Sequence, residues 1–150
     1  MLRRSQDVFE SLRSHEVRYV VIGGIAAVAH GVPRATFDLD ILIDPELDNA
    51  GKLLQALRAC GFGTAHLISP AELLAHEITI FKDKVRIDVQ TSTPGLRFED
   101  AWQHHREMVF GSTVFRVVSR EDLIAAKTAA GRRIDLEDVQ ALHTEPPNPD

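Results

Sequence analysis

The sequence predicts an α/β (α+β) fold in which a small mixed β-sheet is flanked by helices. Three observations point to it: short β-branched runs, amphipathic segments of helical period between them, and glycine, proline or serine at most of the junctions. Helices and strands arranged in this way pack around one sheet and share its core.

The first third of the chain is expected to form a helix, a strand and a shorter helix. Residues 5–15 carry apolar side chains at helical spacing, and residues 18–22 form a β-branched run typical of a buried strand. A glycine pair ends that strand. The Ala-rich segment 25–30 is then expected to be helical up to Gly31, because glycine suits a helix C-cap.

A second strand and a longer helix follow. Residues 37–43 alternate acidic and apolar side chains, as in a strand with one polar face. Asp44 and Pro45 have the pattern of an N-cap followed by proline at the first helical position. The helix is expected to run to about Cys60 and to stop at Gly61.

The middle of the chain contains a capping-box sequence and a pair of strands. Ser69 and Glu72 have the spacing of a capping box, which predicts a short helix ending near residue 75. Residues 77–81 and 85–90 have the composition of two strands joined by a tight turn.

The last third is expected to supply one more hairpin and the final helices. The segments expected are a helical turn or two at 98–105, a hairpin of 108–110 with 113–118, and helices at 119–130 and 134–142.

Length and composition favour one globular domain over residues 1–143, followed by a Pro-rich tail at 144–150 that is expected to be disordered. The chain has 150 residues, of which 44% are hydrophobic and 26% charged, as in ordinary globular proteins. No apolar run approaches the roughly 20 residues of a membrane helix, so no membrane partner is expected. Cys60 is the only cysteine, which excludes an internal disulfide and favours a cytoplasmic location.

The formal net charge of −5 argues against general binding of nucleic acid through phosphate neutralisation. Two short basic segments, Arg132-Arg133 and residues 104–106, stay candidates for a local RNA contact.

Three aspartates are candidates for a metal centre. Asp38 and Asp40 lie two residues apart on an expected strand, so their side chains share one face. Asp88 lies in the middle of another strand, where a charged residue is unusual unless it is exposed or functional. Mg²⁺ prefers oxygen ligands and is often held by carboxylates together with a substrate phosphate. Asp88 could also serve as the general base toward an attacking hydroxyl.

Gly23 and Gly24 could supply the phosphate side of such a site. Glycines let a backbone approach phosphate closely, and the N-terminus of the following helix has free N–H groups. Alone, the pair is a weak signal for phosphate binding, and a tight strand-to-helix turn accounts for it better. Together with the three aspartates, it predicts a site for a polyphosphate and a divalent cation.

The stretch IGGIAAVAHGVPRATFDLDILID resembles the nucleotidyltransferase superfamily, whose members share the polymerase-β-like fold. Within it, the chain is most similar to the minimal group related to abortive-infection toxins of toxin–antitoxin systems. The resemblance covers residues 17–142. Many members have serine where this chain has Gly24, so a hydroxyl contact to phosphate is missing here while the backbone donors remain.

The resemblance implies a role for each matched residue. Those implied to be catalytic and to hold metal are Asp38, Asp40 and Asp88; those implied to bind nucleotide are Gly23, Gly24, Arg34, Thr36 and Lys127. The late segment KTAAGRRIDLEDV also matches the family pattern at Arg132, Asp135 and Asp138, whose roles stay open.

By the same resemblance, the chain is expected to transfer a nucleoside monophosphate from an NTP to a hydroxyl and to release pyrophosphate, as EC 2.7.7 enzymes do. Mg²⁺ would be the cofactor, with Mn²⁺ as an alternative. The partners implied are a tRNA or protein acceptor and an antitoxin. A homodimer is a further expectation, because small domains with a shallow cleft often dimerise.

Other interpretations stay open beside these. Asp135 could be the N-cap of the last helix, Lys127 could be solvated, and Arg34 could simply pair with Asp38 or Asp40. The whole chain could be a nucleotide-binding or partner-binding module without catalysis, or a toxin-like enzyme that contacts tRNA through its basic segments.

Overall fold

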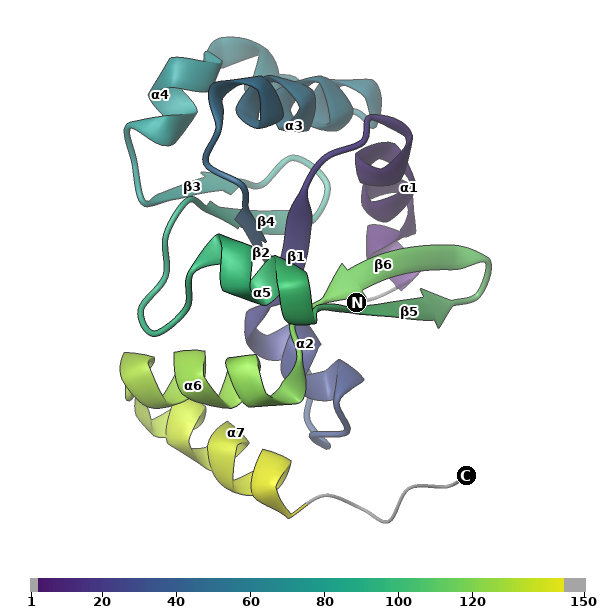
Figure 1. Ribbon diagram of the computed structural model, residues 1–150. Coiled ribbons are helices and arrows are strands. Elements are labelled where there is room, and N and C mark those ends of the chain that lie inside the picture. The colour runs from purple at the N-terminus through teal and green to yellow at the C-terminus, as the bar shows by residue number, and fades with distance from the viewer. Residues whose placement is uncertain (1–2, 145–150) are drawn as a thin grey trace.

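The structure, a computed structural model, describes residues 3–144 and contains a six-stranded mixed sheet with helices on both sides (Figure 1). The strands are β1 (Tyr19–Ile22), β2 (Asp38–Ile43), β3 (Ile78–Phe81), β4 (Arg86–Gln90), β5 (Arg106–Phe110) and β6 (Thr113–Val117). The helices are α1 (Gln6–Ser14), α2 (Gly23–Ala29), α3 (Leu47–Ala59), α4 (Pro70–Leu74), α5 (Phe98–His104), α6 (Arg120–Ala130) and α7 (Arg133–His143), with 3₁₀ turns η1 (Arg3–Ser5) and η2 (Gly63–Leu67).

The strand order is β3-β4-β2-β1-β6-β5, and the sheet is mixed, as the sequence predicts. Central β2 pairs antiparallel with β1 and parallel with β4, while β6 is parallel to β1. Each edge strand is the antiparallel partner of its sequence neighbour, β3 with β4 and β5 with β6. The β2–β4 register sets Asp40 opposite Asp88, and the β1–β2 register sets Asp40 opposite Ile22.

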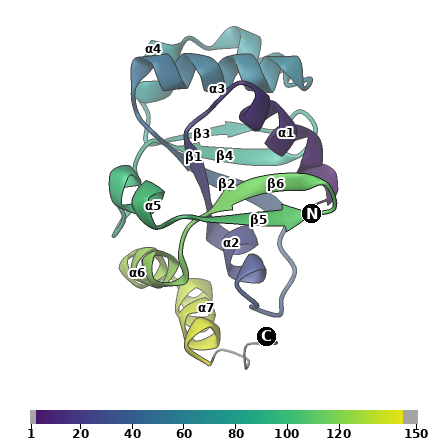
Figure 2. The ribbon, with the colours of Figure 1, turned by 45° about the vertical axis from the view of Figure 1, so that its right-hand side comes forward.

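Helices cover the two faces of the sheet differently. In Figure 2, α1, α3 and α4 lie on one side, and α2, α5, α6 and α7 lie on the other. Apolar alternate residues of β2, such as Leu39 and Ile41, are fully buried, whereas Asp38 and Asp40 on the opposite face stay partly exposed. Phe9 of α1 stacks on Phe115 of β6 with ring centroids 4.7 Å apart, which fastens the first helix to the sheet.

Serine caps begin two helices as the sequence predicts. The Ser69 side chain accepts a hydrogen bond from the Glu72 backbone N–H, and the Glu72 side chain accepts one from the Ser69 backbone N–H, so the capping box is complete. The Ser119 side chain caps α6 in the same way by accepting from Asp122 N–H. Gly131 ends α6 with φ +68°, a left-handed conformation that glycine adopts without strain.

The predicted Asp44 cap of α3 is wrong. The helix begins at Leu47 with Glu46 at the N-cap position. Asp44 is buried and pairs instead with Arg18, whose Nη1 lies 3.0 Å from Asp44 Oδ2. Its main-chain oxygen also accepts a hydrogen bond from the side chain of Asn49. A buried carboxylate gains more from this ion pair than from a cap at the protein surface.

The predicted Asp135 cap of the last helix is wrong as well. Helix α7 begins at Arg133 after an Arg132 N-cap, and Asp135 occupies the third helical position. There its carboxylate is buried and accepts hydrogen bonds from Arg132 and Lys127. The short helix α2 also starts earlier than predicted, at Gly23 itself.

Within residues 3–144, no helix is long and apolar enough to cross a membrane. The predicted disorder of the tail falls, apart from Thr144, on residues 145–150, which lie outside the described part of the chain.

Candidate functional site

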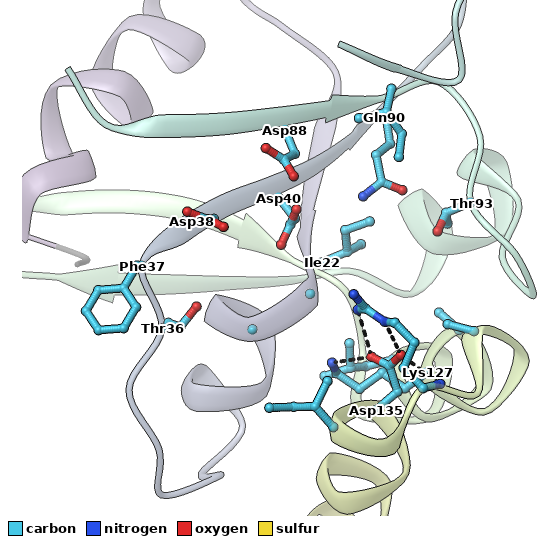
Figure 3. A pocket seen from close by; sticks show the side chains of 18 of the residues that line it. Ile22, Thr36, Phe37, Asp38, Asp40, Asp88, Gln90, Thr93, Lys127 and Asp135 are labelled. Atoms are coloured by element: carbon cyan, nitrogen blue, oxygen red, sulfur yellow. Dashed lines mark hydrogen bonds and ion pairs between the residues drawn. The ribbon is translucent and has the colours of Figure 1, made fainter. Parts of the chain in front are cut away.

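A pocket of about 640 Å³ opens where the carboxylate face of the sheet meets α6 and α7 (Figure 3). Its wall combines residues of β2 and β4, the turn between β1 and α2, the loop that precedes β2, and the α6–α7 pair. All eight residues that the sequence singled out as catalytic or nucleotide-binding line it: Gly23, Gly24, Arg34, Thr36, Asp38, Asp40, Asp88 and Lys127.

The three aspartates lie together on one wall. Asp38 and Asp40 share a face of β2 because strand side chains alternate, and the parallel register with β4 sets Asp88 beside Asp40. Burial raises the pKa of Asp40 to about 7, and the neighbouring carboxylates of Asp88 and Asp38 add to the rise. A carboxyl group held in this way binds a proton or a cation readily near neutral pH.

Arg86 lies on the same wall and contacts two of these aspartates. Its Nε lies 2.9 Å and its Nη2 3.3 Å from the two carboxylate oxygens of Asp88, and its Nε lies 3.7 Å from Asp38 Oδ2. These carboxylates raise the pKa of the Arg86 guanidinium, with the Asp88 hydrogen bond as the largest cause. In this state the carboxylate expected to act as a base is therefore already bonded to a cation.

The chemistry of the wall fits a divalent cation. Within residues 3–144, no three histidine, cysteine, aspartate or glutamate side chains are already arranged as a metal-binding cluster. Asp38 and Asp40 nevertheless offer the two carboxylates that commonly hold Mg²⁺ beside a substrate phosphate. The raised pKa of Asp40 reflects crowded negative charge, which a cation would relieve. Asp88 could join them once its contact with Arg86 opens.

The Gly23-Gly24 turn between β1 and α2 lies directly against side chains of the aspartate wall and of the loop that precedes β2. Gly23 has φ +70°, and a Cβ placed on it would lie 2.9 Å from the carboxyl carbon of Asp40. A Cβ on Gly24 would lie 2.5 Å from Thr36 Oγ1 and 3.0 Å from Arg34 Nη2. A side chain at position 24 would therefore require the side chain of Thr36 or Arg34 to move.

The opposite wall is a network of ion pairs around two buried carboxylates, and it joins α6, α7 and the loop that precedes β2. Lys127 Nζ lies 2.8 Å from Asp138 Oδ2 and 3.5 Å from Asp135 Oδ1. Arg34 Nε and Nη2 each lie 2.9 Å from one oxygen of Asp138, a bidentate contact. Arg132 Nε lies 2.7 Å from Asp135 Oδ2. Three cations thus surround two buried carboxylates, which leaves this wall with a net positive charge.

This network corrects two of the alternative interpretations. Lys127 is not solvated, since its side chain is only 6% exposed. Arg34 pairs with Asp138 and not with Asp38 or Asp40. Burial raises the pKa of Asp138, but the hydrogen bonds and charges of Arg34 and Lys127 outweigh it, so the pKa is lowered overall. The pKa of Asp135 is lowered by the same balance, with Arg132 as its main partner.

Sequence reasoning assigned no role to several pocket residues. Phe37 precedes the first aspartate, lines the pocket and is 79% exposed, although a phenylalanine at a strand start usually packs inward. Ile78 and Ile134 add apolar surface from β3 and α7. Ile78 lines the pocket because it pairs with Gln90 across β3–β4, and the sequence does not predict that register. Arg86 was foreseeable, because strand alternation places it on the face of Asp88.

The two basic segments lie on separate elements. Arg132 lines the pocket and is paired with Asp135, while Arg133 is exposed and pairs with Glu137. His104, at the end of α5, lies 3.0 Å from Asp122 of α6 through its Nδ1. Acidic partners therefore already engage three of these basic side chains.

The pocket thus has an anionic wall facing a cationic one, with apolar side chains at its rim. In Figure 3, Asp38, Asp40 and Asp88 lie on the sheet side, and Lys127 and Asp135 lie on the helix side. A ligand with a metal-bound polyphosphate would satisfy both walls at once, because its phosphates could meet the cationic wall while the metal meets the carboxylates.

Comparisons with known proteins agree with this arrangement. Residues 3–144 match the model of a family described as nucleotidyltransferase of unknown function (DUF6036). Among solved structures, the chain is similar to the 1.87 Å crystal structure of a Thermotoga maritima protein, TM1012, whose assignment as a nucleotidyltransferase is provisional. The TM-score is 0.62 at 17% sequence identity, with 97% of this chain and 93% of that chain covered. No curated protein matches the chain.

Proposed function

Because the chain belongs to this nucleotidyltransferase family, we propose that it transfers the nucleoside monophosphate of an NTP to a hydroxyl acceptor with release of pyrophosphate. The observation that carries the proposal is the single pocket in which three aspartates face the Arg34–Lys127–Arg132 cations. The family membership supports nucleotidyl transfer in general, and the pocket supplies the reason to expect metal dependence in this chain.

The proposed roles follow from the two walls. The acceptor oxygen attacks the α-phosphorus of the NTP, forming one P–O bond while the bond between the α-phosphorus and the α–β bridging oxygen breaks. Pyrophosphate leaves with that bridging oxygen and its bonding electrons. The acceptor proton passes to Asp88, or to water, as the bond forms. Lys127 and Arg132 line the pocket, and in this proposal their positive charge would stabilise the departing pyrophosphate.

Asp38 and Asp40 would hold Mg²⁺ or Mn²⁺, with Asp88 as a third ligand. When bound, the cation would polarise the phosphate and lower the pKa of the attacking hydroxyl. Gly23 and Gly24 let the triphosphate approach the backbone, and Thr36 offers its hydroxyl at the same place.

The acceptor is proposed only as a hydroxyl on an RNA, a protein or a small molecule. A toxin–antitoxin role, an antitoxin partner, a homodimer and a cytoplasmic location are proposals that rest on the sequence alone. The bonds of Arg132 and His104 to aspartates count against strong tRNA binding through the basic segments.

Calorimetric titration of each NTP with Mg²⁺ tests the proposal, using the wild type and the double variant Asp38→Ala/Asp40→Ala. Asp48→Ala is the matched control, because that aspartate is exposed on α3 and does not line the pocket. We expect Mg²⁺-dependent binding in the wild type and the control and its loss in the double variant.

A transfer screen with NTPs labelled at the α-phosphate follows, over RNA, protein and small-molecule acceptors. Label on an acceptor would support the enzyme. Mg²⁺-dependent binding with no transfer to any acceptor would favour the non-catalytic nucleotide-binding module. Absence of NTP binding by the wild type would refute both.

A further inference from the structure

Arg86 is a cation within the carboxylate wall itself. It lies directly opposite Asp38 across β2–β4 and two residues before Asp88, so all three side chains share one face of the sheet. Its guanidinium takes both oxygens of Asp88, at 2.9 and 3.3 Å, and approaches Asp38 at 3.7 Å. The contact fills the space between two carboxylates with fixed positive charge.

The other cations that line the pocket are differently placed. Arg34, Lys127 and Arg132 are each bonded to Asp135 or Asp138 in the opposite wall. Arg86 instead engages the candidate metal ligands directly. Because an arginine guanidinium stays protonated at any physiological pH, this positive charge can leave the carboxylates only by movement of the side chain.

Such movement is feasible for Arg86. Its side chain is 40% exposed, so its guanidinium can rotate toward solvent. The Asp88 side chain is 15% exposed and is more confined. Arginine also binds phosphate in the same bidentate geometry that it uses for a carboxylate. A polyphosphate that entered the pocket would therefore give the guanidinium an equivalent partner.

We propose that Arg86 is a positioning residue that keeps Asp88 from the metal until nucleotide arrives. In the nucleotide-free protein, its guanidinium occupies Asp88 and competes with a divalent cation for the wall. When a metal–triphosphate enters, Arg86 transfers to a phosphate oxygen and Asp88 is released to complete the metal site or to accept the acceptor proton. This inference rests on the proposed function and adds an order of events to it.

A purely structural ion pair leads to a different expectation. If Arg86 only joined β4 to β2, its removal would loosen the sheet and would leave metal affinity unchanged or weakened. If it competes with the cation, its removal would tighten metal binding in the absence of nucleotide. Direct metal titration separates the two, and it needs no enzymatic activity.

The experiment measures Mn²⁺ binding by electron paramagnetic resonance of the free ion, without nucleotide, in the wild type, Arg86→Gln and Arg86→Lys. We expect Arg86→Gln to bind Mn²⁺ about tenfold more tightly than the wild type, the scale for a unit charge a few ångström away in largely aqueous surroundings. Arg86→Lys keeps the charge without the bidentate contact and should lie between them. Arg133→Gln removes the same charge from an exposed pair outside the pocket and should match the wild type.

Two further measurements tie the effect to Asp88 and to nucleotide. The double variant Arg86→Gln/Asp88→Asn should lose the tightening. With a non-hydrolysable NTP analogue present, wild type and Arg86→Gln should bind Mn²⁺ with similar affinity, because Arg86 has then left the carboxylate.

Equal or weaker Mn²⁺ binding by Arg86→Gln, beside Mg²⁺-dependent NTP binding in the wild type, would overturn this inference and leave the proposed function standing. Absence of both Mn²⁺ and NTP binding in every protein would remove the proposed function and the inference with it. Thermal unfolding of each variant verifies that it is folded, and Arg86→Lys decides the question if Arg86→Gln is not.

Discussion

Asp40 is the residue at which folding and the proposed function favour different protonation states: folding favours the protonated carboxyl group, and metal binding favours the ionised one. Its carboxyl group lies between Asp38 and Asp88, beneath the glycine turn, and its pKa is raised to about 7 by burial and by those two neighbours. Without a cation, the folded protein therefore holds a proton that an unfolded chain would release near pH 4. A cation bound at the wall would favour the ionised form, so metal binding should release protons near neutral pH.

Ionising Asp40 in the folded protein should cost free energy. In the absence of metal, we therefore expect Asp40→Asn to change the free energy of unfolding by an amount that depends on pH. Below about pH 4, Asp40 is protonated in both states and costs nothing. Between about pH 4 and pH 7, only the folded state keeps the proton, so wild-type stability falls as pH rises, and above pH 7 the loss is complete. The variant should gain up to about 4 kcal/mol over the wild type across that window, since each unit of pKa shift corresponds to about 1.4 kcal/mol.

Urea unfolding in EDTA at pH 4.5 and pH 8 measures this gain, with the exposed Asp48→Asn as control. A gain of the same size at both pH values would mean that Asp40 does not titrate in this range.

Residue-scale prediction from the sequence succeeded where geometry is local. Alternation along a strand is enough to put Asp38 and Asp40 on one face, and the structure places them there. The partner of Arg34 was not predictable, because it is Asp138 on α7 and the contact spans 104 positions of the chain. No local rule links residues so distant in sequence.

At the scale of elements, the turn from β1 into α2 is the part of the site that leaves least room for a side chain. The positive φ of Gly23 is one that other residues rarely adopt, and the adjacent Asp40 side chain leaves no room for a Cβ. The sequence predicted a break here, and the structure adds that the helix starts within the glycine pair.

We expect Gly23→Ala to lower stability by on the order of 2 kcal/mol and to weaken Mg²⁺–NTP binding, because the strained backbone and the displaced Asp40 act together. Gly63→Ala is the matched control, since nothing lies within 4 Å of a Cβ placed there and its φ is not positive. Urea unfolding and NTP calorimetry on both variants provide the measurement. Equal behaviour of the two variants would show that the turn tolerates a side chain and does not position the site.

Element boundaries were predictable where a serine side chain supplies the N-cap, as at Ser69 and Ser119. The start of α3 was misplaced at Asp44, whereas α7 begins within one residue of its predicted start although Asp135 is not its N-cap. Both aspartates are buried, and Asp44 pairs with Arg18, which is distant in the chain. Asp135 accepts hydrogen bonds from the backbone N–H and the side chain of Arg132, so it caps α7 from the third helical position. Only at Asp44 did tertiary ion pairing outweigh the local preference for capping.

At the scale of the whole molecule, the pocket exists because α6 and α7 are held against the loop that leads into β2. Within residues 3–144, the cross-link is electrostatic: Lys127 on α6 contacts Asp135 and Asp138 on α7, and Arg34 reaches Asp138 from that loop. The sequence could predict the helices and strands, but not the strand order or this closure, since both depend on contacts between distant segments.

Lys127→Met tests whether this network holds the pocket closed. Methionine keeps most of the side-chain volume but leaves two buried carboxylates short of a cation, so we expect a loss on the order of 3 kcal/mol in the free energy of unfolding. Hydrogen exchange followed by mass spectrometry should show faster exchange in α7 than in β1 and β2, because α7 loses its main charged contact with α6. Arg133→Gln removes an exposed pair from the same helix and should change stability by less than about 0.5 kcal/mol. If Lys127→Met were no more destabilising than this control, or if exchange rose equally in the sheet, the network would not be what fastens α7. The cationic wall would then owe its position to apolar packing and to contacts such as the hydrogen bond from Arg120 to the main-chain oxygen of Leu142.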